Sequence, residues 1–131
     1  MTPDPKPPVP TEHQEQVVFF QWISYHPTIR DLTFAIPNGG SRHKLEAVNL
    51  KAEGVRAGVP DIFIALPMGK FHGLFIEMKR QKGGVLSDVQ KGWIERLAEQ
   101  GYVARVCKGF FEAKETVERY LLGNGYTLGG K

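Results

Sequence analysis

Two carboxylates and a lysine stand in two short apolar segments of this 131-residue chain. Asp61 precedes the run Ile-Phe-Ile-Ala-Leu, and Glu77 and Lys79 close the run Leu-Phe-Ile-Glu-Met-Lys. Both runs are rich in β-branched and aromatic residues and are bounded by Gly or Pro, which predicts strands over residues 58–66 and 73–79. Since side chains alternate along a strand, Glu77 and Lys79 should share one face of the sheet.

These side chains could surround one hard cation. Carboxylate oxygens suit Mg²⁺, and a lysine beside them could position a water or stabilise developing negative charge. Asp61 and Glu77 are therefore candidate metal ligands and Lys79 a candidate catalytic residue for hydrolysis of a phosphodiester. Each also has a plainer interpretation: Asp61 as a turn residue, and Glu77 with Lys79 as an ion pair on a solvated face. The apolar neighbours of Glu77 favour the cation, because a buried charge needs a partner.

Two further polar residues have two interpretations each. Segments 11–14 (Thr-Glu-His-Gln) and 87–90 (Ser-Asp-Val-Gln) have the form of capping boxes that begin helices. Gln90 could serve only that cap, or it could also reach the edge of the site. Glu12 could act only on the dipole of its helix, or it could lean toward the cation.

Basic and polar residues around these segments are candidate phosphate contacts. Asn38 lies in the turn sequence Pro-Asn-Gly-Gly, which Arg42 follows, and Arg80 and Lys82 come directly after Lys79. The same residues are equally compatible with an ordinary turn and with solvated surface charge.

Composition narrows the class of protein. The net charge of +3, from 17 basic and 14 acidic residues, permits a nucleic-acid partner without requiring one. The single cysteine, Cys107, excludes an internal disulfide and a cysteine-rich zinc site, and the four histidines show no metal-ligand spacing. No run approaches the ~20 apolar residues of a membrane span, so a cytoplasmic location is the default expectation.

One α/β domain over residues 11–122 is expected, between a Pro-rich tail (1–10) and a Gly-rich tail (123–131). The predicted order is α-β-α-β-β-α-β-α. A helix between the third and fourth strands implies a parallel crossover within a mixed sheet flanked by helices. The other elements are expected as helices at 11–25, 43–53, 87–100 and 110–122, and as strands at 32–36 and 102–107.

The first helix is apolar on more than one face, which predicts either deep burial or contact with a second subunit. Trp22 in that helix and Trp93 in a later one are expected in the core or at a subunit contact rather than as stacking platforms for bases. Cys107 is expected to be buried packing.

Four motifs give the chain a recognisable pattern: Gly-Val-Pro-Asp, Ile-Glu-Met-Lys, Gly-Gly-Val-Leu-Ser-Asp-Val-Gln and Gly-Tyr-Val-Ala-Arg-Val-Cys. The pattern resembles the VRR-NUC (virus-type replication-repair nuclease) family of the PD-(D/E)xK nuclease superfamily, over about residues 12–111. The resemblance implies a restriction-endonuclease-like core.

By this resemblance Asp61 and Glu77 would bind Mg²⁺ or Mn²⁺ together with the backbone carbonyl of Met78. Gln90 would assist the site, and Glu12 would be an additional acid. Family members act on DNA, and small stand-alone phage or bacterial versions are similar to homodimeric Holliday-junction resolvases. The resemblance therefore implies branched DNA as substrate, a homodimer, and a role in replication, recombination or repair.

The resulting hypothesis is cation-dependent phosphodiester hydrolysis by a structure-specific endonuclease, with one cation or two. Two alternatives stay open. The chain could be a non-catalytic nucleic-acid-binding module with the same fold, although such a module has no need for Asp61, Glu77 and Lys79 together. It could also be a restriction-type endonuclease that recognises a duplex sequence.

Overall fold

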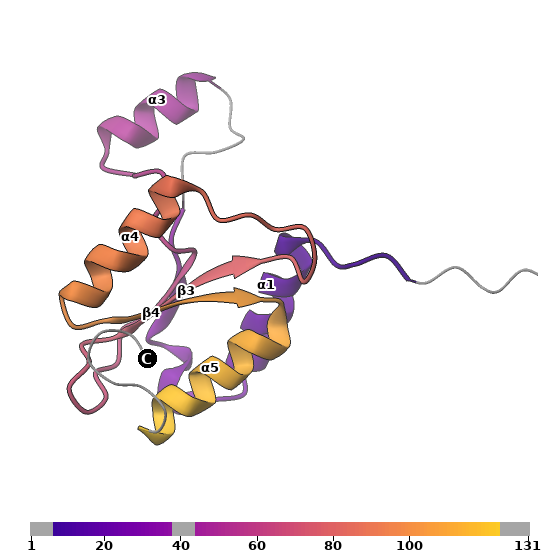
Figure 1. The fold of residues 1–131 in the computed structure, drawn as a ribbon, viewed down its shortest axis with the longest axis vertical. Coiled ribbons are helices and arrows are strands. Elements are labelled where there is room, and N and C mark those ends of the chain that lie inside the picture. Colours follow the sequence, from indigo (N-terminus) through magenta and orange to yellow (C-terminus); the bar gives the residue numbers. More distant parts are fainter. Residues whose placement is uncertain (1–6, 38–43, 124–131) are drawn as a thin grey trace, which may run out of the picture.

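The computed structural model describes residues 7–37 and 44–123, which form helices around one sheet (Figure 1). The helices are α1 (Glu12–Ile23), α2 (Pro27–Arg30), α3 (Lys44–Ala52), α4 (Asp88–Glu99) and α5 (Phe110–Leu122). The strands are β1 (Thr33–Ala35), β2 (Ile62–Ile64), β3 (Leu74–Lys79) and β4 (Val103–Lys108). The expected order of elements is confirmed apart from α2. That helix has only four residues and begins at a proline, so it is too short to leave a periodic pattern.

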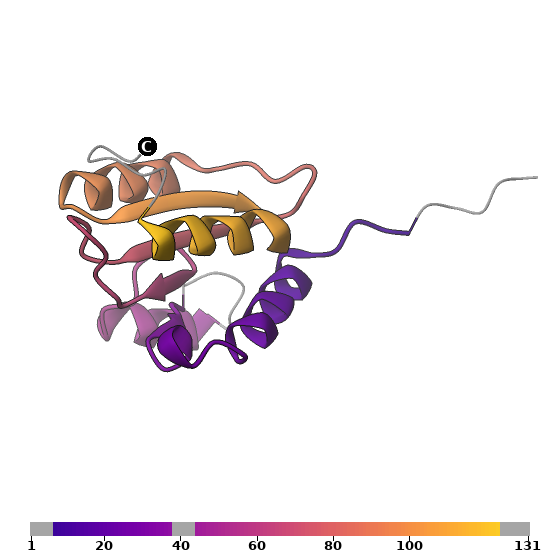
Figure 2. The same ribbon diagram turned by 90° about the horizontal axis from the view of Figure 1, so that it is seen from below.

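The sheet has the order β1-β2-β3-β4 and is mixed, as expected. β1 pairs antiparallel with β2, and β2 with β3, while β3 and β4 run parallel. The parallel pair is joined through α4, which lies on one side of the sheet, with α1 and α5 on the other (Figures 1 and 2). Since parallel strands end at the same edge, the last residues of β3 and β4 lie together, with Lys79 opposite Lys108.

Both predicted capping boxes are present. The Thr11 hydroxyl accepts from the Gln14 backbone N–H at 3.1 Å, and the Gln14 amide oxygen accepts from Thr11 N at 2.9 Å. Ser87 and Gln90 make the same reciprocal pair at 3.2 and 2.9 Å. Each box satisfies two N–H groups that a helix start leaves without partners, so α1 and α4 begin where the sequence predicts.

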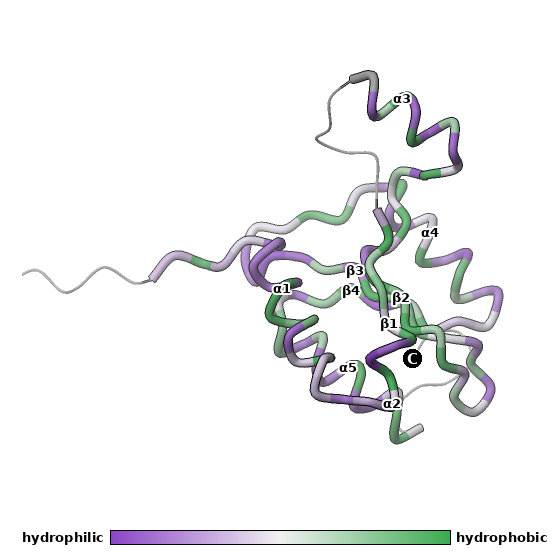
Figure 3. The backbone as a smooth tube through the Cα atoms, turned by 180° about the vertical axis from the view of Figure 1, so that it is seen from behind, coloured by the Kyte–Doolittle hydropathy of each residue, from purple (hydrophilic) through white to green (hydrophobic). Residues whose placement is uncertain are grey.

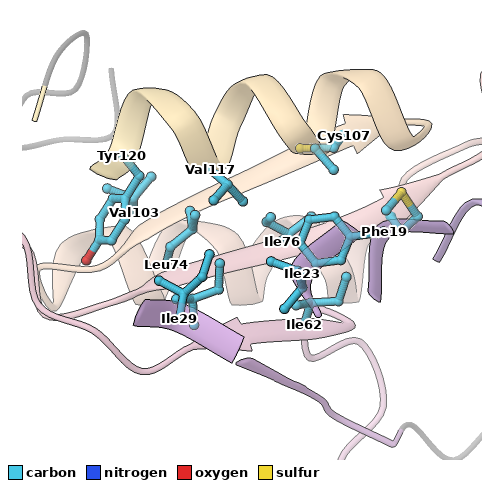
Figure 4. Packing of buried hydrophobic residues seen from close by; sticks show 13 residues of the cluster. Phe19, Ile23, Ile29, Ile62, Leu74, Ile76, Val103, Cys107, Val117 and Tyr120 are labelled. Atoms are coloured by element: carbon cyan, nitrogen blue, oxygen red, sulfur yellow. The ribbon is translucent and has the colours of Figure 1, made fainter. Parts of the chain in front are cut away.

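The hydrophobic core lies between the sheet and the two helices α1 and α5 (Figure 4). Ile76 and Met78 of β3 point into it, whereas Glu77 and Lys79 belong to the other face, as the strand alternation predicts. Cys107 is also in the core and only 1% exposed, which confirms that it is packing. Burial raises the pKa of its thiol to about 11.

Helix α1 buries one face and leaves another exposed. Phe19 and Ile23 reach the core, and Trp22 packs against its edge. Val17 and Val18, part of the hydrophobic stretch of α1 that is green in Figure 3, remain 43% and 42% exposed. Deep burial of the whole helix is therefore excluded, and apolar surface is left for another contact.

Trp93 of α4 is not part of the hydrophobic core, so of its two expected positions the core is excluded and a subunit contact stays a prediction. It is half-buried beside α3, which stands off the body of the fold (Figure 1). Several expectations concern residues outside 7–37 and 44–123: the outer parts of both tails, the Asn38 turn, Arg42 and the start of the second predicted helix. Within the described ranges, no helix has both the length and the apolar character needed to cross a membrane.

Val117→Ala on α5 should lower the free energy of unfolding by about 1–3 kcal/mol, because it leaves a cavity where two buried methyl groups were packed. Val117 is 0% exposed and contacts the core. Urea unfolding followed by circular dichroism measures the loss. Val48→Ala on α3 is the matched control, since Val48 is helical but 61% exposed. Equal effects of the two changes would contradict the assigned core.

Candidate active site

Asp61 lies just before β2, and its side chain continues the hydrogen bonding between β2 and β3. β2 begins at Ile62, opposite Ile76, so Asp61 comes next to Glu77 along the two strands. Asp61 Oδ2 accepts a hydrogen bond of 2.8 Å from the backbone N–H of Met78. This bond holds the Asp61 carboxylate beside Glu77. The sequence predicts this proximity, because it places the two acids on adjacent strands.

Glu77 is a buried acid in an unfavourable setting. It is 2% exposed, and its Oε1 has no hydrogen-bond donor among the described residues. Burial first and the neighbouring Asp61 second raise the pKa of this carboxyl from 4.5 to about 9. Burial therefore disfavours the ionised form of this carboxyl, and an additional positive charge beside it would favour ionisation.

Gln90 combines both of its predicted roles. Its amide oxygen completes the capping box of α4, and its amide nitrogen donates to Glu77 Oε2 at 3.2 Å. The cap fixes the side chain in the orientation that the contact with Glu77 requires. The helix start thereby positions one oxygen of the buried acid and leaves Oε1 available.

Lys79 lies next to these acids with its side chain only 10% exposed. Its Nζ is 3.9 Å from Glu77 Oε2 and 4.0 Å from Glu12 Oε1. The structure thus brings Glu12, whose side chain is 48% exposed, to the lysine. A nearly buried ammonium with two acids within 4.0 Å stays oriented toward the site.

A hard cation fits the oxygens of this site. Asp61 and Glu77 have adjacent carboxyl groups. Glu77 Oε1 receives no hydrogen bond from the described residues. The carbonyl of Lys79 points toward β4, where it accepts from Gly109 N at 2.9 Å. Backbone carbonyls point to alternate sides along a strand. The carbonyl of Met78 therefore points away from β4, toward Asp61. No group of three or more His, Cys, Asp or Glu side chains in the described part of the chain could hold a metal. Asp61, Glu77 and the carbonyl of Met78 stay the predicted ligands, and the role of Glu12 as an additional ligand also stays a prediction.

Glu15 and Gln81 support the site and were not singled out from the sequence. Glu15 is 5% exposed; its Oε1 accepts from Phe110 N at the start of α5, and its Oε2 accepts from Gln81 Nε2 at 2.8 Å. Gly109 has φ +92°, and a Cβ there would lie 2.8 Å from Glu15 Oε2, so only glycine leaves room for this contact. An acid three residues after Glu12 in an apolar helix was the signal that could have indicated it.

The predicted phosphate contacts are only partly within the described residues. Arg80 and Lys82 are exposed beyond the end of β3, and the Arg80 guanidinium donates to the carbonyl of Val9 at 3.3 Å. Asn38 and Arg42 lie outside the described ranges. The contacts of all four with DNA stay predictions.

A mixed sheet flanked by helices, with two acids and a lysine brought together at the start of β2 and the end of β3, is the arrangement of the PD-(D/E)xK nuclease type, and comparison with known proteins agrees. The model of the VRR-NUC domain matches residues 10–111, so the chain belongs to the VRR-NUC family. A solved structure described as a VRR_NUC domain protein is 28% identical, with a TM-score of 0.78, over 95% of this chain and 98% of the other. Among curated proteins none matches. Nucleases of this type usually use divalent metal ions.

Glu77→Gln should flatten the pH dependence of stability in the cation-free protein. The raised pKa of Glu77, about 9 against 4.5, means that the folded state keeps a proton that the unfolded chain has lost. The contribution of Glu77 to the free energy of unfolding therefore falls as pH rises from 4.5 to about 9. Glutamine does not titrate, so the variant lacks this pH-dependent loss of stability. Thermal unfolding in EDTA across this range measures it.

Added Mg²⁺ or Mn²⁺ should raise the melting temperature of the wild type more than that of Glu77→Gln, because the ion stabilises the ionised carboxyl. Glu115→Gln, a change at an exposed acid of α5, is the control and should behave as the wild type. An identical pH slope for wild type and Glu77→Gln would contradict the raised pKa.

Proposed function

We propose that this protein is a divalent-cation-dependent DNA endonuclease that acts on branched DNA. The observation that carries the proposal is the buried Glu77 carboxyl, with its donorless Oε1, between Asp61 and Lys79. Burying such an acid lowers stability, and a binding module gains nothing from it. A catalytic site gains a fixed ligand for a cation and a place next to it for a phosphodiester.

The chain's own groups divide the work. Asp61, Glu77 and the carbonyl of Met78 would hold the cation, Mg²⁺ or Mn²⁺. When bound, the ion supplies Lewis acidity toward the phosphate and toward the attacking water. Lys79 stabilises the charge that develops on the phosphate oxygens, or positions the water. Gln90 holds Glu77 Oε2 at 3.2 Å.

A second copy of the chain would supply the geometry for branched DNA. The exposed apolar face of α1 forms a groove of about 660 Å³ that includes Val17 and Phe20 and continues to Ala35 of β1. Apolar surface of this kind marks contact sites. In a homodimer formed through α1, two carboxylate sites would face two strands of a junction. Arg80 and Lys82, with Asn38 and Arg42, would contact phosphates.

Lys79→Ala should lower the rate of DNA cleavage in Mg²⁺ by about 10²–10⁴-fold, because it removes a positioned charge at the reacting phosphate. DNA affinity should stay close to that of the wild type, since one buried amine adds little to binding. Lys91→Ala is the matched control: Lys91 is on α4 with its side chain 57% exposed. Single-turnover cleavage and anisotropy titration measure the two quantities. Unchanged cleavage by Lys79→Ala would contradict the proposed mechanism and favour the alternative of a non-catalytic binding module.

Four-way junctions should be cut faster than splayed-arm or fully paired DNA of the same sequence, in Mg²⁺ and in Mn²⁺ but not in EDTA. The reason is that a dimer with two sites fits paired strands of a junction. Gel assays on end-labelled substrates give the rates. Equal cutting of a fully paired duplex at one defined sequence would instead identify a restriction-type enzyme.

A further inference from the structure

A second concave site lies between α3 and α4, outside the carboxylate site. It encloses about 720 Å³, within the range of roughly 300–1,000 Å³ that small-ligand sites span. The residues that matter in its lining are two apolar side chains, an indole and three cations: Val48, Val89, Trp93, Lys51, Arg56 and Arg96. The described residues that line it include no acid.

Trp93 organises two of these cations. Its indole N–H donates to the carbonyl of Ala57 at 3.1 Å, which fixes the ring. The guanidinium carbons of Arg96 and Arg56 lie 4.9 and 5.8 Å from the ring centre. At such distances each guanidinium is attracted electrostatically to the face of the ring. Two like charges held at one ring repel each other, so an anionic ligand would relieve the repulsion.

The apolar part of the lining indicates what kind of anion fits. Val48 and Val89 are 61% and 55% exposed at the groove, so apolar surface stands in water beside the guanidinium groups. A nucleotide of an unpaired strand has both complements, phosphates for the cations and a flat base for the apolar wall. The bases of a paired duplex are stacked inside the double helix. A duplex would therefore leave the apolar side chains of the groove exposed to water.

The groove shares two of its segments with the carboxylate site. Ala57 lies four residues before Asp61, and Val89 directly precedes Gln90. The segments touch at Gly58, which has φ +85° and whose added Cβ would lie 2.4 Å from Val89 Cγ1. The groove and the carboxylate site are therefore neighbours along both segments.

We infer that the groove between α3 and α4 binds an unpaired stretch of a DNA strand, with Arg56 and Arg96 on its phosphates and a base against Val48 and Val89. The inference rests on the proposed function and deepens it. It assigns to this surface the recognition of single-stranded character, which a splayed arm offers next to its branch point.

The test compares binding of splayed-arm and fully paired DNA of equal length in EDTA, where cleavage does not intervene. The double variant Arg56→Gln with Arg96→Gln should bind splayed-arm DNA about tenfold more weakly, and the slope of log Kd against log salt should fall by about 1.4, from about 0.7 per lost phosphate contact. Duplex affinity should fall less. Arg30→Gln on α2, an exposed arginine outside the groove, is the control.

A second pair of variants does not depend on the cations. Val48→Glu should weaken splayed-arm binding more than Val48→Gln, and the 61% exposure of Val48 makes both changes compatible with folding. Equal losses for splayed-arm and paired DNA, or no loss in any groove variant, overturn the inference while cation-dependent cleavage still stands. A wild type that cleaves no DNA overturns the proposed function, but the binding comparison in EDTA keeps its outcome.

Discussion

The structure depends on the burial of one acid beside another at the end of β3. Glu77 is 2% exposed, and Asp61 lies close enough to raise its pKa further. Apolar burial by the core on the opposite face of the strand has to offset this cost, since a buried carboxyl with an oxygen that lacks a hydrogen-bond partner lowers the stability of the fold. Ile76 and Met78, which flank Glu77 in sequence, belong to the core. β3 therefore contributes both the destabilising buried acid and part of the apolar burial that offsets it.

Three helix starts converge on this end of the sheet. α1 begins with Glu12 near Lys79, α4 is capped by Gln90 on Glu77, and α5 begins after Gly109, whose N–H donates to the carbonyl of Lys79. Helix starts carry partial positive charge. The starts of α1, α4 and α5 therefore place partial positive charge near the end of the sheet that carries the acids.

Sequence reasoning predicted the parts of this arrangement that are local. Alternation placed Glu77 and Lys79 on one face, and the pattern Ser-x-x-Gln located the start of α4. What it missed depends on contacts across the chain. Glu15 meets Gln81 and the start of α5 from 66 and 95 residues away, and neither partner is visible in a local pattern. Trp93 was expected in the core or at a subunit contact, whereas its position beside α3 depends on how a separate helix docks.

The double use of Gln90 ties the start of a helix to the geometry of the site. Its oxygen terminates the capping box and its nitrogen holds Glu77, so the two functions share one rotamer. Any change of loop length or composition ahead of Ser87 that moves the helix start by one residue would also turn this amide away from the acid. Catalytic and folding defects in that loop would then be inseparable, and sequence drift there is restricted even at loop positions that contact no substrate.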